Sequence, residues 1–115
     1  MTAIAGSKPA LYNYLASPAA PEHNYGMTMP ETIPGVFLAQ AQRLARKPLF
    51  WVKRQGRYRP ITWDQARQTV QALSAYFLHV GIKPGERIVI LSENRPEWGM
   101  TDLAVQAVGA WTVPL

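Results

Sequence analysis

The acidic side chains that could serve catalysis gather in the last quarter of the chain. Glu93 and Glu97 are one helical turn apart, a spacing at which two carboxylates could act as general acid and general base. Arg95 stands between them, and Glu97 is placed to cap a helix, so the pattern favours a structural role over catalysis. Asp102 could pair with Arg95 or face water. We therefore assign no catalytic residue to this chain.

Metal-binding and nucleophilic side chains are scarce. The chain has no cysteine, which excludes a disulfide, a thiolate zinc site, an iron–sulfur cluster and a cysteine nucleophile. His23 and His79 lie far apart and belong to no H-x-x-x-H or H-E-x-x-H pattern, so ordinary solvated side chains are expected. The patterns G-x-x-x-x-G-K-[ST], G-x-G-x-x-G and G-x-S-x-G are absent. No metal-binding or cofactor-binding residue is predicted.

The positive charge is concentrated in one segment. The 115 residues carry twelve Lys and Arg against seven Asp and Glu, a net charge of +5. Residues 32–63 hold no acidic residue and seven of the basic ones, so the remaining five basic and seven acidic residues leave −2 elsewhere. The seven are Arg43, Arg46, Lys47, Lys53, Arg54, Arg57 and Arg59.

This basic segment admits three interpretations. Trp51 and Tyr58 alternate with the cations and could stack on bases of a nucleic acid. A solvated hairpin, whose charges keep an edge strand from pairing with other chains, accounts for the same pattern and also for Pro60, so no nucleic-acid partner is predicted. Peripheral contact with an anionic membrane surface stays open.

Length and composition limit the chain to one domain. At 48% hydrophobic and 17% charged it is too apolar to be disordered throughout, and 115 residues support a single core. No apolar run reaches the roughly 18 residues of a membrane-spanning helix. The N-terminus lacks a secretory apolar region, which predicts a cytoplasmic protein.

The elements begin after a proline-rich stretch. Residues 1–31 contain four prolines and no periodicity, which predicts an extended or disordered leader. A helix is expected from Thr32 to the turn before Pro48, and its apolar positions are Ile33, Phe37, Ala41 and Leu44. A hairpin follows, with strands at Leu49–Lys53 and Tyr58–Ile61 around a Gln55-Gly56 turn.

A long helix comes next. Thr62 and Gln65 form a capping box at its start, and Gly81 is the expected left-handed stop. Its apolar stripe is Ala66, Val70, Leu73, Phe77 and Val80. The polar residues expected elsewhere on its surface are Arg67, Gln68, Gln71 and Ser74.

The remaining elements predict an α/β unit. Ile88–Leu91 is a run of apolar residues typical of a strand covered on both faces of a parallel sheet. A helix follows, with Asn94 and Glu97 as a candidate capping pair and Gly109 at its end, and Trp111–Leu115 begins another strand. The buried face of that helix is expected to be Met100, Leu103, Ala104, Ala107 and Val108. The result is a βαβ unit with parallel strands, whose Ser92–Asn94 loop lies at the edge where open sheets bind ligands.

Two motifs at a fixed spacing carry a family resemblance. The pattern G-x-K-P-G-[DE]-R-[IV] occurs at Gly81–Ile88, and E-N-R-P-E-W occurs at Glu93–Trp98. Further matching pieces are Thr62–Gln65, Val89–Ile90, Asp102–Ala104, Gly109–Ala110 and Val113–Leu115. Residues 32–115 thus resemble the amino-terminal section of the AMP-forming acyl-CoA synthetase (adenylate-forming) superfamily. The second motif is most similar to the long-chain fatty acid–CoA ligase branch.

This resemblance implies a fold and a reaction. Such enzymes combine a large N-terminal domain of parallel sheets with a small mobile C-terminal domain. They use ATP and Mg²⁺ to convert a fatty acid to an acyl-adenylate and then transfer the acyl group to CoA. The resemblance implies a phosphate-binding loop, a metal-binding acidic residue, a ribose-binding aspartate and a carboxylate-binding lysine, all beyond the residues present here. No family site residue is therefore assigned within this sequence.

The end of the chain leads to the last expectation. Pro114-Leu115 lies part-way through an apolar strand, and the strand at Arg87–Leu91 would keep an unpaired edge. We expect residues 32–115 to be a partial N-terminal domain of a fatty acid–CoA ligase, inactive alone and binding no ATP, Mg²⁺ or CoA. Another AMP-forming carboxylate-activating enzyme and a small basic polyanion-binding module are the alternatives. Acyl chain length and oligomeric state are not predicted.

Overall fold

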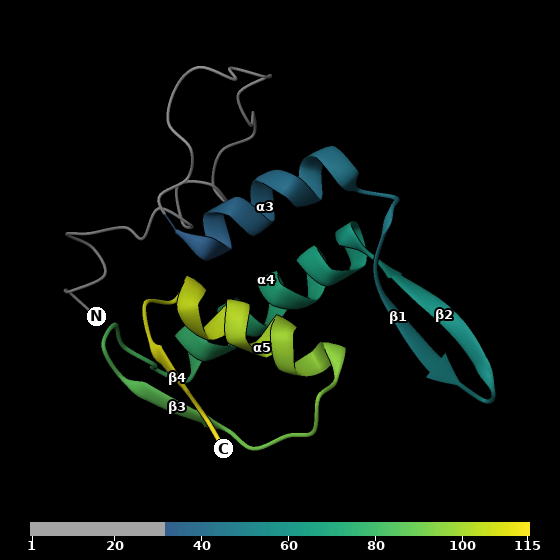
Figure 1. Cartoon of the computed structure of the whole chain (residues 1–115). Coiled ribbons are helices and arrows are strands. Elements are labelled where there is room, and N and C mark those ends of the chain that lie inside the picture. The colour runs from purple at the N-terminus through teal and green to yellow at the C-terminus, as the bar shows by residue number, and fades with distance from the viewer. Residues whose placement is uncertain (1–31) are drawn as a thin grey trace.

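Within residues 32–115, seven elements follow one another in the predicted order of helix, hairpin, helix, strand, helix, strand. The computed structural model describes residues 32–115, so the leader predicted over 1–31 and His23 lie outside the described residues. The elements are α3 (Ile33–Leu44), β1 (Pro48–Arg54), β2 (Arg57–Thr62), α4 (Trp63–His79), β3 (Arg87–Ile90), α5 (Pro96–Ala107) and β4 (Trp111–Pro114). The three helices pack on one another, with the β1–β2 hairpin projecting from one end and the β3–β4 sheet beside α5 (Figure 1). Among residues 32–115, no helix has both the length and the apolarity needed to cross a bilayer.

Helix α3 begins with a side-chain cap. The Gly35 N–H donates to Thr32 Oγ1 over 3.2 Å, and Pro34 occupies the first turn, where a missing N–H has no cost. Phe37 and Ala41 are buried as the spacing predicts. Ile33 lies on the same face, four residues before Phe37, but it is 65% exposed and is not part of the core. It lies in the first turn, and the buried face continues through Leu38 instead.

The β1–β2 hairpin is an antiparallel pair closed by two residues. Gln55 and Gly56 both have positive φ, 51° and 76°, which is the type I′ geometry that matches the twist of a hairpin. The register pairs Trp51 with Pro60 and Lys53 with Tyr58. Successive residues of each strand therefore alternate between an outer face and a face directed toward the helices.

The capping box predicted for α4 is present. The Gln65 N–H donates to Thr62 Oγ1 over 3.1 Å, and Gln65 Oε1 accepts from the Thr62 N–H over 2.9 Å. Gly81 follows the helix with φ of 89°, the left-handed conformation expected of a helix stop.

Removing this cap tests how much α4 depends on it. We expect Thr62→Ala to lower the free energy of unfolding by about 1 kcal/mol, because the Gln65 N–H then loses its acceptor. Urea unfolding followed by circular dichroism measures the change. Thr101→Ala is the control, since the Thr101 hydroxyl bonds Glu97 O within α5 and caps no helix. An equal loss in both variants would contradict the capping role.

One residue of α4 was predicted on the wrong face because its side chain is polar. Ser74, expected on the surface, is 2% exposed. Its hydroxyl donates to the Val70 carbonyl over 2.8 Å, and this bond within the helix satisfies the group that burial would otherwise penalise. Conversely Val80, assigned to the apolar stripe, is 51% exposed because it lies beyond the last helical turn.

The main core lies between the three helices. It contains Phe37, Leu38, Ala66, Val70, Met100, Ala104 and Ala107. The rings of Phe37 and Trp63 stack at a centroid distance of 5.8 Å, which joins α3 to the start of α4. Val105, Val108 and Ala110 form a second cluster between α5 and the sheet. Val105, whose exposure is 0%, was not among the residues predicted for the buried face of α5.

The βαβ prediction is confirmed, with two corrections. Strands β3 and β4 are parallel, with Arg87 opposite Trp111 and Ile90 opposite Pro114. Within residues 32–115 only one face of this sheet is covered: Ile90 is buried, whereas Val89 is 56% exposed. The exposed side chains of the other face and of the strand ends include Leu91, Trp111 and Leu115. The sequence pattern alone had predicted cover on both faces.

The second correction concerns the start of α5. Its N-cap is Arg95 rather than Asn94, and the cap has no side-chain hydrogen bond. Pro96 forces the preceding residue into an extended conformation, with φ of −134° and ψ of 156° at Arg95, and itself occupies the first helical position. Asn94 is therefore one residue too early to cap.

Candidate functional site

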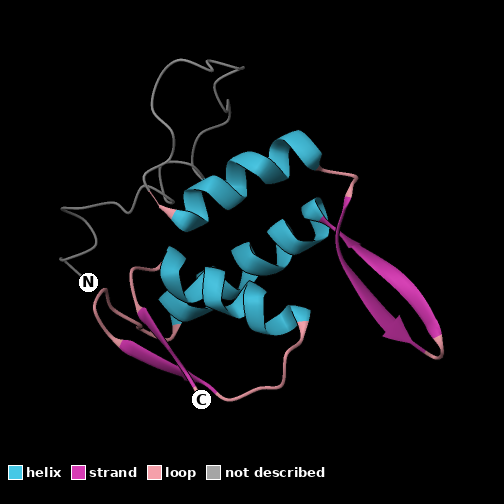
Figure 2. Ribbon diagram, viewed as in Figure 1, coloured by secondary structure: helices cyan, strands magenta, loops and turns pink. Residues whose placement is uncertain are grey.

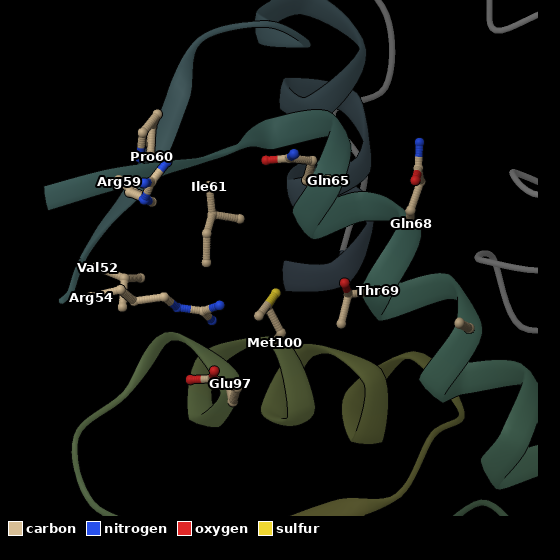
Figure 3. Close-up of a pocket in the computed structure, with 11 residues that line it drawn as sticks. Val52, Arg54, Arg59, Pro60, Ile61, Gln65, Gln68, Thr69, Glu97 and Met100 are labelled. Atoms are coloured by element: carbon tan, nitrogen blue, oxygen red, sulfur yellow. The ribbon is translucent and has the colours of Figure 1, made fainter. Parts of the chain in front are cut away.

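An open hollow lies where the hairpin meets the starts of α4 and α5. Its volume is about 710 Å³ (Figure 3). Val52, Ile61 and the buried Met100 give it apolar surface. The other lining residues are Arg54, Arg59 and Pro60 of the hairpin, Gln65, Gln68, Thr69 and Ala72 of α4, and Glu97 of α5.

The hairpin register brings both arginines to this hollow. Val52 pairs with Arg59 and Arg54 with Arg57, so Val52, Arg54 and Arg59 share the face directed toward the helices. In Figure 3 the Arg54 side chain extends toward the α5 end of the hollow, where Glu97 lies. Two guanidinium groups and an apolar surface therefore stand on the same side of the cavity.

The charges here suit binding better than proton transfer. Glu97 is the only carboxylate that lines the hollow, and its Oε2 lies 3.9 Å from Arg95 Nε. Both side chains are more than half exposed, so this ion pair contributes little stability. A general acid and a general base need two groups at the reacting atoms. The lining of the hollow supplies no such pair.

The residues noted for possible chemistry do not assemble around it. Glu97 lines the hollow, while Glu93 is an exposed loop residue outside its lining. Asp102 accepts from Gln106 Nε2 over 3.0 Å rather than pairing with Arg95. The Ser92–Asn94 loop follows β3, and the Ser92 hydroxyl donates to the Glu93 carbonyl over 3.0 Å. Over residues 32–115 no three His, Cys, Asp or Glu side chains are grouped closely enough to hold a metal ion.

The α4 wall of the hollow was not found from sequence. Gln65, Gln68, Thr69 and Ala72 recur at intervals of three and four, so they share one helix face. That spacing was readable, but it predicts only a solvated face. Which face of α4 lies near the hairpin depends on the angle between the hairpin and the packed helices.

Fold and motifs together define a class of protein. Residues 37–115 match the family model described as AMP-binding enzyme. The match covers more than half of the chain and includes the βαβ unit and both motifs. This chain belongs to the AMP-binding enzyme family.

Individual relatives extend the comparison. The chain is 37% identical over 60 residues to the long-chain-fatty-acid–CoA ligase FadD15 of Mycobacterium bovis, a match that covers 52% of this chain and 10% of the relative. The same enzyme of Mycobacterium tuberculosis is 37% identical over 59 residues, covering 51% of this chain and 10% of the relative. The matched region thus spans about a tenth of the length of these curated relatives.

Solved structures agree with the fold. The acetoacetyl-CoA synthetase of Streptomyces lividans superposes with a TM-score of 0.64 at 28% identity, over 69% of this chain and 12% of that one. A fatty acyl-adenylate ligase from L. pneumophila gives a TM-score of 0.66 at 22% identity, over 71% of this chain and 14% of that one. The second likeness shows the fold alone. The expected α/β fold, the N-terminal part of an adenylate-forming large domain with a hairpin and a parallel βαβ unit, is confirmed.

Proposed function

We propose that this chain is the amino-terminal part of a long-chain fatty acid–CoA ligase. The parent reaction consumes ATP, a fatty acid and CoA and yields acyl-CoA, AMP and pyrophosphate through an acyl-adenylate. The observation that supports this most is the 37% identity to two enzymes named long-chain-fatty-acid–CoA ligase, combined with the family match over residues 37–115.

We further propose that these 115 residues do not catalyse the reaction alone. The described residues do not fit Mg²⁺ or a triphosphate: they include no cluster of metal-binding side chains, and the carboxylate of the hollow lies beside Arg95. The sequence also has no glycine-rich phosphate loop. ATP, Mg²⁺ and CoA are therefore assigned to the parent enzyme, and no catalytic step is assigned to residues of this chain. Residues 32–115 would form part of its large domain, in a cytoplasmic protein with peripheral membrane contact.

The G-x-K-P-G-E-R-I motif at Gly81–Ile88 has a structural role. In the G-x-K-P-G-E-R-I motif the Lys83 N–H donates to Glu86 Oε2 over 2.8 Å, which closes the turn before β3. The Glu86 carbonyl then accepts from the Trp111 N–H over 2.7 Å, which ties that turn to β4. The motif thus sets the start of the parallel sheet, and this explains its value as a family signature without any catalytic role.

Exchange of labelled pyrophosphate into ATP tests the proposal. We expect no fatty-acid-dependent exchange from the 115-residue chain and clear exchange from a protein translated from the gene read beyond the Leu115 codon. Robust exchange from the isolated chain would refute its incompetence. A stop codon directly after Leu115, with no ligase sequence in any downstream frame, would overturn the parent-enzyme assignment.

A further inference from the structure

The outer face of the β1–β2 hairpin exposes two aromatic rings. The register places Trp51, Lys53 and Tyr58 on this face, opposite the face that borders the hollow. Trp51 is 60% exposed and Tyr58 is 67% exposed, and neither belongs to a core cluster. The hairpin projects from the helices as a two-stranded ribbon (Figures 1 and 2). Large apolar rings on a projecting element mark a surface for contact with another body.

The charge on the same hairpin is unbalanced. Within residues 32–115 the ion pairs are Arg67 with Asp64 and Arg95 with Glu97, so none of the hairpin cations is paired there. Arg54 lies directly opposite Arg57, an arrangement that destabilises a strand pair by like-charge repulsion. Arg59 adds a third guanidinium on that face. These three arginines lie on the face that borders the hollow, and Lys53 is the hairpin cation on the face with the rings.

We propose that the β1–β2 hairpin docks on the surface of an anionic lipid bilayer. Tryptophan and tyrosine favour the headgroup level of membranes, where the ring is apolar and its N–H or O–H finds a polar partner. Trp51 and Tyr58 enter that level, and Lys53 beside them meets lipid phosphates. Arg57 lies next to the turn at the tip of the hairpin, and its long side chain can extend to the same anionic layer, whereas Arg54 is directed into the hollow. This proposal stands on the hairpin alone and does not rest on the ligase assignment.

The shape of the hairpin favours a membrane over a nucleic acid. Proteins that bind single strands combine a basic groove along the backbone with a series of stacking rings. Here the rings lie on the outer face of a ribbon, and the hollow lies on the opposite face with apolar Val52, Ile61 and Met100. A flat membrane surface can contact both rings at once. A single nucleic-acid strand needs a groove around the rings, and the outer face of the ribbon has none.

Vesicle cosedimentation of the full 115-residue chain tests the proposal. Vesicles of phosphatidylcholine with about 30 mol% phosphatidylserine are compared with pure phosphatidylcholine at a salt concentration of about 0.15 M. We expect binding to the anionic vesicles and at least tenfold weaker binding to the neutral ones. Replacing two cations in Lys53→Gln/Arg57→Gln should weaken binding about 30-fold, since each basic residue near such a surface contributes roughly a factor of five. Trp51→Ser/Tyr58→Ser should weaken it at least tenfold.

Matched variants separate the hairpin from other surfaces. Lys83→Gln and Tyr76→Ser remove an exposed cation and a 58% exposed ring outside the hairpin, and both should bind like the unmodified chain. Leu91→Ser probes the open face of the β3–β4 sheet and should also leave binding unchanged. Circular dichroism establishes that each variant is folded.

Three results would overturn the proposal. One is equal binding to neutral and anionic vesicles. Another is loss of binding in Leu91→Ser with no change in the hairpin variants, which would assign the contact to the sheet face. The third is tight binding of oligothymidylate without vesicle binding, which would make the hairpin a nucleic-acid surface.

Discussion

Replacing Phe37 by alanine is expected to lower the free energy of unfolding by about 3 to 5 kcal/mol, the range for truncating a buried aromatic side chain. Phe37 is 7% exposed and lies in the core cluster shared by the three helices. Its ring stacks on Trp63, the first residue of α4, so the variant loses a ring contact as well as buried area.

Urea unfolding monitored by circular dichroism measures this effect. Ile33→Ala is the matched control, because Ile33 is on the same helix but 65% exposed, and its loss should cost less than about 0.5 kcal/mol. If Phe37→Ala unfolds outright, Phe37→Leu removes less volume and gives a measurable midpoint. Similar losses at positions 33 and 37 would contradict the burial pattern of α3.

Local signals explain the elements that were predicted well. The capping box of Thr62 and Gln65 needs only residues three apart, and its bonds form as the spacing predicts. The Gln55-Gly56 turn likewise depends on the backbone freedom of two adjacent residues. Such features were readable because every atom that decides them lies within one turn of chain.

The predictions that failed concern features that depend on contacts between residues far apart in the sequence. Ser74 is buried because a helix-internal bond satisfies its hydroxyl, so polarity alone misplaced it. The β3 strand has one open face within residues 32–115, whereas its apolar run predicted cover on both, because a sequence pattern records which residues avoid water but not what covers them. The hollow escaped prediction for the same reason, since it depends on how the hairpin sits against α4 and α5.

The G-x-K-P-G-E-R-I motif at Gly81–Ile88 also explains a geometric constraint on Gly109. This residue ends the α5 region with φ of 79°, and its carbonyl accepts from the Gly85 N–H over 2.9 Å. A Cβ built there lies 3.2 Å from Pro84 Cβ, closer than such atoms normally come. The turn of the K-P-G motif therefore rests directly on the backbone of Gly109, and the close approach holds β3 and β4 in register.

Gly109→Ala is accordingly expected to lower the free energy of unfolding by about 3 kcal/mol, of which left-handed backbone strain supplies about 1 to 2 kcal/mol and displacement of Pro84 about 1 kcal/mol or more. Gly81→Ala separates the two causes, because Gly81 has φ of 89° but no atom within 4 Å of a built Cβ, so it should cost only the strain. Amide hydrogen exchange adds a local readout: the Trp111 N–H, which bonds the Glu86 carbonyl, should exchange faster in Gly109→Ala than in Gly81→Ala. Equal stability losses and equal exchange in the two variants would show that Pro84 moves aside freely and that this contact does not hold the sheet together.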